Sequence, residues 1–410
     1  MNIHGTGCGI LDCIYADEDF SGPGYRTAMS KTAGDGGLTP GRLVFSSALE
    51  QFMGRPYDEV MALLNGGKVP DTRNLGGPSA VSLAHASQML ADADNAFAVR
   101  YYGVRGGDET GDALEEKFSA LPFADVKLLR KDCPNSRVDV LSDPRYDNGS
   151  GERTFVYRKG SLDEFYPADL TEDFFDAALA AFGGTALTPH LHDGLTPLLK
   201  KARRRGAVTE VNLVYDYRSE LENPGQKWRL GLQDDAYSYI DLLLADQEEA
   251  LKTSGKPAVQ EAAAWFLEQG CGAAVITRGR KPLLFCAASG TAQRAGVFGA
   301  GRSLFQKAGL TALPVCEKVN RELAACPERR GDTTGCGDNF TGQVIAGLAK
   351  ALAAGQESGI DLREICIPAV AAGGFCCFTV GGTYYEKEQG EKRRLLEPYI
   401  SAYRSQLAPV

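Results

Sequence analysis

Two aspartates bracket a run of small residues in RRGDTTGCGDNFTGQVIAGLAKALAAG, which spans residues 329–355. Asp332 and Asp338 flank the run, and apolar residues at helical spacing follow Asp338. The small side chains of Gly335–Gly337 leave backbone amides open to an anion at the start of the expected helix. An isolated Asp338 would be typical of a helix cap. Beside open amides, it could instead take the proton of a hydroxyl group that attacks a phosphoryl group held there.

A scaffold of alternating strands and helices must position this stretch. From Leu162 onward, segments with helical periodicity alternate with short apolar runs that are typical of buried strands. The expected helices include residues 171–182 and 192–206, and the expected strands include residues 184–189, 208–216, 238–246 and 272–279. This alternation predicts an α/β fold with a mostly parallel central sheet covered by helices on both faces. In such folds ligands bind beyond the carboxyl ends of the strands.

Two earlier segments do not fit inside such a sheet. Residues 136–143 and 152–159 alternate apolar and polar side chains and are separated by a turn-rich segment, which predicts a hairpin with one wet face. Residues 16–74 are rich in Gly, Pro, Asp and Ser. Together these segments predict a small β appendage on one edge of the main sheet.

Composition limits the partners and the location. The 410 residues carry a net charge of −9, which argues against nucleic-acid or anionic-membrane partners. The N-terminus lacks the pattern of a secretory signal, and no apolar run approaches the roughly 20 residues that a membrane span needs. We therefore expect a cytoplasmic protein. The 11 cysteines include no C-x-x-C pair, which favours reduced thiols over a metal site.

The segment DTTGCGD, residues 332–338, resembles the second signature of the PfkB, or ribokinase-like, family of carbohydrate kinases. The family pattern is D-T-x-G-A-G-D, and here Cys336 stands where alanine is usual. Six further segments resemble motifs of the family in the same order: NLGGPSAVSLAHASQML (74–90), YYGVRGGDETGDALEEKF (101–118), GERTFVYRKGS (151–161), LLLADQEEAL (242–251), VITRG (275–279) and AAGGFCCFTVGG (371–382). The resemblance implies one ribokinase-like kinase domain over residues 1–410, with a three-layer α/β/α fold. It also implies a β lid formed by about residues 12–55 and about residues 135–160.

The resemblance assigns roles to individual residues. Asp338 would be the general base, and Gly335, Cys336 and Gly337 would form the anion hole for the transferred phosphoryl group. The residues expected to bind the acceptor are Asp12, Gly76, Gly77 and Asp338. The residues expected to bind ATP are Asp246, Thr277, Gly279, Gly335, Gly337, Gly373 and Gly374.

The resemblance also implies cations. Glu249 would support the Mg²⁺ of the nucleotide through water, and Asp332 would help to hold a monovalent cation such as K⁺. Each assignment has an ordinary structural alternative. An acidic run at residues 246–249 is typical of a solvated helix start, and Asp332 suits a turn at the entry of a helix. Paired glycines such as Gly373 and Gly374 also serve helix packing.

Three departures from the family pattern concern the acceptor. Val81, Asp246 and Val370 stand where asparagines are usual, and the long segment between Asp12 and Gly76 resembles that of adenosine-kinase-like members. The leading interpretation is an ATP-dependent kinase that phosphorylates the hydroxymethyl group of a small sugar. A nucleoside kinase of the adenosine type is the alternative, and a non-catalytic ribokinase-like ligand-binding protein is a second alternative. The sequence leaves the oligomeric state open, including a homodimer.

Overall fold

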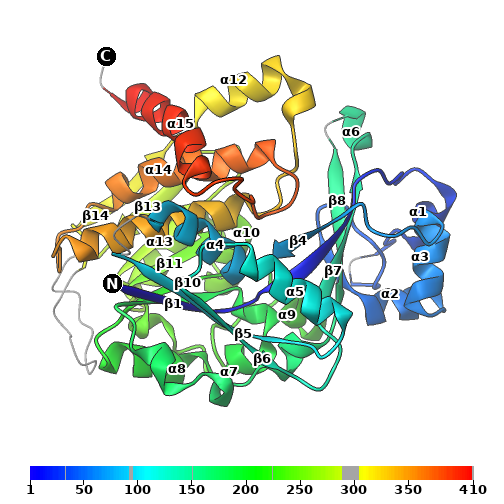
Figure 1. Ribbon diagram of the computed structural model, residues 1–410, viewed down its shortest axis with the longest axis horizontal. Helices are drawn as coiled ribbons and strands as arrows, with labels where there is room; N and C mark the ends of the chain where they lie inside the picture. The colour runs from blue at the N-terminus through cyan, green and yellow to red at the C-terminus, as the bar shows by residue number, and fades with distance from the viewer. Residues whose placement is uncertain (33, 92–95, 150, 224, 289–303, 409–410) are drawn as a thin grey trace.

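The protein is built around two β-sheets, as the computed structural model of residues 1–32, 34–91, 96–149, 151–223, 225–288 and 304–408 shows (Figure 1). Among these residues the larger sheet has nine strands in the order β14-β13-β12-β11-β10-β9-β1-β5-β6. Its strands are β1 (Asn2–Gly7), β5 (Ala98–Arg105), β6 (Asp125–Arg130), β9 (Leu179–Gly183), β10 (Val208–Asn212), β11 (Leu242–Asp246), β12 (Ala273–Thr277), β13 (Leu283–Ala287) and β14 (Ala308–Leu313). Neighbouring strands run parallel from β6 to β12, and only β13 and β14 pair antiparallel. The predicted mostly parallel sheet is confirmed.

The central strands are apolar along most of their length because helices cover both faces of the sheet. In β11, Leu242 and Leu244 pack into one core, while Leu243 and Ala245 pack into the other. The first core is shared with α4 (Pro78–Leu90), α5 (Glu109–Ser119), α12 (Glu317–Ala325), α13 (Cys336–Ala353), α14 (Leu362–Phe375) and α15 (Glu391–Leu407). The second is shared with α7 (Pro189–Asp193), α8 (Leu195–Arg204), α10 (Gln247–Ser254) and α11 (Val259–Glu268). The expected three-layer arrangement is therefore present. In the part of the chain that the structure describes, no helix combines the length and apolarity needed to cross a bilayer.

A second sheet of five strands follows directly from the first, because only Cys8 and Gly9 separate β1 from β2. Its order is β3 (Leu43–Phe45), β8 (Glu152–Arg158), β7 (Arg137–Asp143), β2 (Ile10–Tyr15) and β4 (Thr72–Gly76). Strands β7 and β8 form the predicted antiparallel hairpin. Helices α1 (Pro23–Ala28), α2 (Ser46–Met53) and α3 (Tyr57–Asn65) pack on the outer face of this sheet, at the right of Figure 1.

One predicted helix and one predicted strand are wrong. Residues 171–182 form a short 3₁₀ turn, Glu172–Phe175, and then the central strand β9. Residues 184–189 form another 3₁₀ turn, Thr185–Leu187, which leads into α7. The β9 sequence LAAFG is buried on both faces, and so short an apolar run has no periodicity that separates a strand from a helix. Its neighbours in the sheet, β1 and β10, decide its conformation.

Glu210 is an isolated carboxyl group inside the main sheet. It lies on β10, is fully buried, and neither of its carboxyl oxygens has a hydrogen-bond partner among the described residues. Its register partners are Ala181 and Leu242, which are apolar. Burial without a partner raises the pKa of Glu210 well above its ordinary value, because the charged form is poorly solvated there.

We predict that Glu210→Met stabilises the protein, and does so more at high pH. The folded state holds a proton on Glu210 that the unfolded chain loses above pH ~4.3, so the free energy of unfolding falls as pH rises through this window. Methionine removes the buried carboxyl group and its pH-dependent loss of stability, so Tm should rise by about 2 °C or more at pH 8 and by less at pH 5. Thermal denaturation at both pH values measures the effect. The exposed Glu116→Met on α5 is the control, and an equal gain at both pH values would contradict the assignment.

Candidate active site

The candidate site lies where the carboxyl ends of the central strands meet the N-terminus of α13. The last residues of β11 and β12, Asp246 and Thr277, are register partners in the parallel sheet. Helix α13 begins at Cys336, after Gly335. Asp338 acts electrostatically on Glu249, in the first turn after β11, so the two regions are close in space. This is the edge at which open α/β sheets bind ligands.

A left-handed turn at Gly335 opens the start of α13. Gly335 has φ 75°, and a Cβ at this position would lie 2.4 Å from the Cα of Gly382, so only glycine fits. A Cβ on Gly337 would meet no atom within 4 Å, which shows that this side of the turn faces open space. The amide of Cys336 donates to Thr333 O at 3.3 Å, whereas the amides of Gly337 and Asp338 have no acceptor in the described chain. The turn can therefore present these two amides to an anion.

The side chain of Asn339 holds this turn in place. Its Nδ2 donates to Gly335 O and to Gly382 O, both at 2.8 Å. Its Oδ1 accepts from Lys392 Nζ and from His85 Nδ1, both at 2.9 Å. Burial lowers the pKa of Lys392 to about 8 and that of His85 to about 3. Asn339 was not among the residues predicted from the sequence, although a polar residue directly after Asp338 in an apolar helix was a usable signal.

Carboxylates converge beside the turn. Asp338 is half-buried and still reached by solvent, and burial raises its pKa to about 7. Asp12 on β2 is 5% exposed, and its pKa is raised to about 8 by burial first, then by the charges of Asp332 and Asp338. The structure thus brings Asp12, Asp332 and Asp338 together, although more than 300 residues separate the first from the others in sequence.

Arg153 supplies a positive charge to this cluster from the second sheet. It lies on β8, and its Nη1 donates to Thr333 Oγ1 at 2.6 Å. Its guanidinium group favours the charged form of Asp12, since it lowers the pKa of that carboxyl group against the effect of burial. Arg153 was inside the segment that resembles the lid strand, but nothing in that segment marked it as a site residue.

The other expected acceptor residues surround Asp12. A Cβ on Gly76 would lie 2.2 Å from Asp12 Oδ2, so glycine there makes room for the carboxyl group. Gly77 lies against the carbonyl of Cys8, where a Cβ would come within 2.6 Å. Asn74 is the register partner of Asp12, and its Nδ2 donates to the carbonyls of residues 380 and 383, both at 3.2 Å. Asn74 therefore supports residues 380–385, which form the segment behind the turn.

The expected nucleotide residues separate into two groups. Thr277 and Gly279 lie at the end of β12, and a Cβ on Gly279 would meet no atom within 4 Å, so this edge is open. Gly373 and Gly374 serve close helix packing. A Cβ at residue 373 would lie 3.0 Å from Cys336 O, and one at residue 374 would lie 3.1 Å from Val319. Their expected contact with adenine stays a proposal.

The expected cation ligands also form local hydrogen bonds. Asp246 and Glu249 cap α10 reciprocally: Asp246 Oδ1 accepts from Glu249 N at 2.8 Å, and Glu249 Oε2 accepts from Asp246 N at 2.7 Å. Asp332 accepts from the amides of Thr334 at 2.7 Å and of Gly381 at 3.1 Å, so it shapes the turn whether or not a cation binds. Within the described ranges, no cluster of three or more His, Cys, Asp or Glu side chains could hold a metal.

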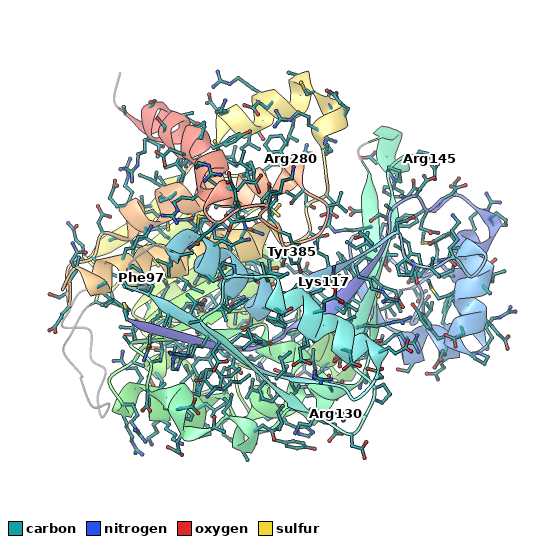
Figure 2. All side chains as sticks on the ribbon, viewed as in Figure 1. Phe97, Lys117, Arg130, Arg145, Arg280 and Tyr385 are labelled. Carbon is teal, nitrogen blue, oxygen red and sulfur yellow. The ribbon has the colours of Figure 1, made fainter. Side chains whose placement is uncertain are left out.

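At two of the three positions where the signatures usually have asparagine, the side chain packs among apolar residues. Val81 on α4 is 2% exposed, and a Cβ on Gly382 would meet it at 3.1 Å, so it supports the segment behind the turn. Val370 on α14 packs against the core that α13 shares. The segment behind the turn also contacts α5, where Lys117 Nζ lies 5.5 Å from the centre of the Tyr385 ring. Both residues are labelled in Figure 2.

No protein-family model matches the chain. Solved structures match over almost its whole length. Adenosine kinase from Schistosoma mansoni in complex with 2-fluoroadenosine is 17% identical with a TM-score of 0.67, and the match covers 94% of this chain and 97% of that one. Adenosine kinase from Anopheles gambiae in complex with P1,P4-di(adenosine-5) tetraphosphate is 19% identical with a TM-score of 0.64, covering 92% and 95%. A protein described as a probable sugar kinase from Rhizobium etli is 15% identical with a TM-score of 0.64, covering 97% and 98%.

A protein described as a putative ribokinase II from E. coli also matches, at 15% identity with a TM-score of 0.61, covering 98% of this chain and 99% of that one. The chain has the ribokinase-like α/β fold: a large, mostly parallel sheet with helices on both sides and a second, smaller sheet. The fold expected from the sequence is confirmed.

We predict opposite consequences for alanine at the two glycines of the turn. Gly335→Ala should unfold the turn, because its left-handed backbone alone costs about 1–2 kcal/mol with a side chain and Gly382 blocks the Cβ. Gly337→Ala should retain the fold, since alanine suits the first turn of a helix and its methyl group meets open space. Thermal denaturation measures the loss of folding, and binding of a nucleoside triphosphate measures the effect on the anion site. The added methyl group would occupy the open space beside the amides, so Gly337→Ala should weaken nucleotide binding although it keeps its own amide. Unchanged binding would mean that no phosphate group lies in that space.

Proposed function

We propose that this protein is an ATP-dependent kinase that phosphorylates a hydroxymethyl group of a small sugar. The observation that carries the proposal is the position of Asp338. Its carboxyl group has a pKa of about 7 and follows the open amides of a left-handed turn. A base whose pKa lies near the working pH is suited to take a hydroxyl proton. The amides beside it are suited to hold the charge of a transferred phosphoryl group.

The described residues divide the work of such a transfer. Asp338 would accept the proton of the acceptor hydroxyl as its oxygen attacks phosphorus. The amides of Gly337 and Asp338 would stabilise the charge on the phosphoryl oxygens, and Arg153 could add a positive charge from the second sheet. Bound ATP with Mg²⁺ would supply the phosphoryl group and neutralise part of its charge. Thr277, Gly279 and Glu249 lie at the edge where that nucleotide would bind.

Asp12 is suited to orient the acceptor. Its buried carboxyl group has a pKa of about 8, which favours the protonated form at neutral pH, and this form can both donate and accept hydrogen bonds. Sugar hydroxyls also donate and accept. The charge of Asp338 helps to raise the pKa of Asp12, so the two groups are close enough for a small acceptor to span both.

A specific observation favours the nucleoside as a second candidate acceptor. Asp12, Val138, Tyr157 and Phe45 follow one register row across β2, β7, β8 and β3, so their side chains share a face of the second sheet. By the strand spacing, Tyr157 lies roughly 10 Å from Asp12 along this face. An aromatic group attached to the sugar could therefore extend towards Tyr157 and Phe45.

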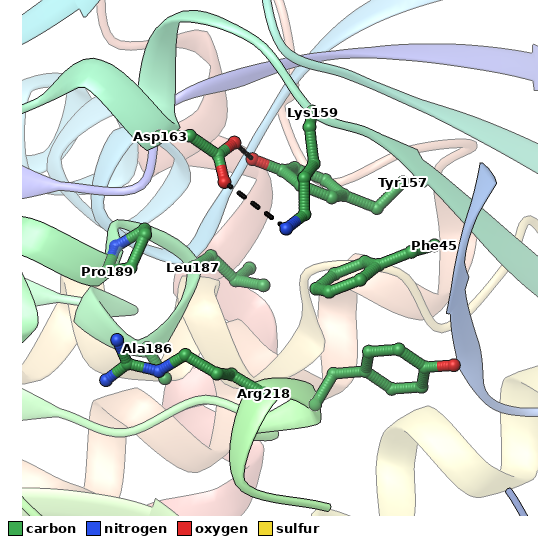
Figure 3. A pocket seen from close by; sticks show the side chains of 9 residues that line it. Phe45, Tyr157, Lys159, Asp163, Ala186, Leu187, Pro189 and Arg218 are labelled. Atoms are coloured by element: carbon green, nitrogen blue, oxygen red, sulfur yellow. Dashed lines mark hydrogen bonds and ion pairs between the residues drawn. The ribbon is translucent and has the colours of Figure 1, made fainter. Parts of the chain in front are cut away.

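A small cavity lies at that aromatic end of the row. It has a volume of about 40 Å³ and is lined by Phe45, Tyr157 and Tyr217 with Ala186 and Leu187 (Figure 3). The ring centroids of Phe45 and Tyr217 are 4.5 Å apart. The volume holds roughly three water molecules, so a base would need the exposed Lys159 at its rim to move. The outer-layer aromatics Phe20 and Tyr25, by contrast, are buried in packing against one another.

The structural neighbours support a kinase and are consistent with both acceptors, because they are described as adenosine kinases and a probable sugar kinase. The second alternative, a non-catalytic ligand-binding protein, would have no use for a base with a raised pKa beside unpaired amides. A panel of sugars and nucleosides with Mg-ATP separates the three candidates. Failure to consume ATP with any acceptor would favour the non-catalytic protein.

We predict that Asp338→Asn lowers turnover about a thousandfold while ATP binding changes little, because the amide cannot accept the hydroxyl proton. In the wild type, kcat/KM should rise as pH increases through about 7, since the base acts in its deprotonated form. Steady-state kinetics and calorimetric titration with ATP provide the two measurements.

The control for this variant is Glu328→Gln, an exposed acid in the segment before the turn, which should behave as the wild type. Near-normal turnover in Asp338→Asn would refute the base assignment. Loss of ATP binding in that variant would instead indicate that the side chain supports the anion site.

We predict that Phe45→Ala discriminates between the acceptors. If a nucleoside is the acceptor, loss of ring contact should raise its KM about tenfold with little change in kcat. A free sugar held by Asp12 should be unaffected. The control is Phe52→Ala, which removes a half-buried phenylalanine from the outer core of the same sheet. Equal effects of the two variants on a nucleoside would argue against the cavity as a binding site.

A further inference from the structure

Three thiols surround the turn that starts α13. Cys336 is the first residue of α13, and Cys376 and Cys377 begin the 3₁₀ turn Cys376–Phe378 that follows α14. The Sγ atoms of Cys336 and Cys377 are 3.6 Å apart. The amide of Gly331 donates to Cys377 O at 2.9 Å, so the two segments are also joined by backbone.

Cys336 lies beside both of the other thiols, and exposure favours its pairing with Cys377 over Cys376. Cys376 is 3% exposed, and its thiol donates to Thr334 O at 3.2 Å. Cys376 and Cys377 are adjacent, and the Cα atoms of adjacent residues lie about 3.8 Å apart. Disulfides usually join Cα atoms about 4.4–6.8 Å apart, so an adjacent pair is unfavourable. Cys336 and Cys377 are both half-buried, which leaves them within reach of small solutes.

Cys377 is the more nucleophilic of the two thiols. Its pKa is lowered to about 7, first by the hydrogen bond with the Cys336 thiol and then by the positive charges of Arg280 and Arg153. Arg280 lies on the side of the molecule that carries α12 and α14 (Figure 2). A substantial fraction of Cys377 is therefore thiolate near neutral pH, the form that attacks oxidants.

We propose that Cys336 and Cys377 are an oxidation site, at which hydrogen peroxide forms a reversible disulfide that closes the anion site of α13. The Cys377 thiolate attacks one peroxide oxygen, the O–O bond breaks, and the leaving hydroxide takes a proton, which gives water and a sulfenic acid. The Cys336 sulfur then attacks the sulfenic sulfur, the S–O bond breaks, and a second water leaves with the Cys336 proton. Two thiols and one peroxide thus become one disulfide and two waters. A dithiol reductant reverses the reaction.

The disulfide would change the anion site because of where Cys336 lies. The sulfurs must approach from 3.6 Å to about 2.05 Å, which draws the first residue of α13 towards the end of α14. The amides of Gly337 and Asp338 follow Cys336 directly and must shift with it. This consequence rests on the proposed kinase function, whereas formation of the disulfide does not.

The test uses the reduced full-length protein, treated with hydrogen peroxide and then with dithiothreitol. Peptide mapping without reduction identifies the linked peptides, and phosphotransfer and ATP binding are measured at each stage. We expect one linked peptide pair that contains Cys336 and Cys377. We expect turnover to fall about a hundredfold, as a misplacement of about 1 Å can cause, and to recover with dithiothreitol.

Cys377→Ser, with Cys377→Ala as a second variant, should keep basal activity and resist the oxidant. Cys133→Ser, at a half-buried free thiol elsewhere, should respond as the wild type. A different linked pair, or no linked pair, would overturn the proposal. A Cys336–Cys377 link that leaves ATP binding and turnover unchanged would overturn its inhibitory effect. If the reduced protein phosphorylates no acceptor, the linked peptide and ATP binding still decide the oxidation site, and the kinase function alone fails.

Discussion

The candidate site depends on the hydrogen bonds made by the side-chain amide of Asn339. This amide joins the carbonyl of the left-handed residue Gly335 to the carbonyl of Gly382. Without it, Gly382 O would lose this donor and Gly335 O would keep only the backbone amide of Asn339, so the first turn of α13 would lose its side-chain tie to the segment behind it. The same amide group meets Lys392 and His85, so α4, α13 and α15 are all linked through one side chain. Such a satisfied buried network specifies one arrangement of the turn.

The second constraint is electrostatic. Asp12, Asp332 and Asp338 face one another, and Arg153 is the cation that opposes the charge on Asp12. Burial raises the pKa of both Asp12 and Asp338, and the charges of Asp332 and Asp338 raise that of Asp12 further. Carboxyl groups with such raised pKa values lower the folding stability, and they are typical of sites that bind ligands or carry out chemistry. Burial also raises the pKa of Glu210, but its carboxyl group lies inside the main sheet with no hydrogen-bond partner among the described residues.

Much of the fold could be predicted from the sequence because its signals are local. The turn at Gly335–Gly337 and the helix after Asp338 lie in one short segment, and the β7–β8 hairpin follows from alternation in two neighbouring runs. Strand β9 could not be predicted, since its small apolar residues become a strand only through pairing with β1 and β10. The role of Asn339 was hidden for a similar reason, because its partner His85 is 254 residues away. Arg153 needed the fold to bring it to Thr333, at a separation of 180 residues.

The second sheet carries several site groups on one hydrogen-bonded body. Asp12 lies on β2, Arg153 on β8 and Phe45 on β3, and β7 bridges the first two strands. Strand pairing fixes the spacing of these three side chains relative to one another. A tilt of this sheet against the main body would therefore carry all three together, so that withdrawal of the Asp12 carboxyl group would also withdraw the Arg153 guanidinium group from the turn. For the acceptor proposed above, release and loss of this positive charge would then occur in one movement.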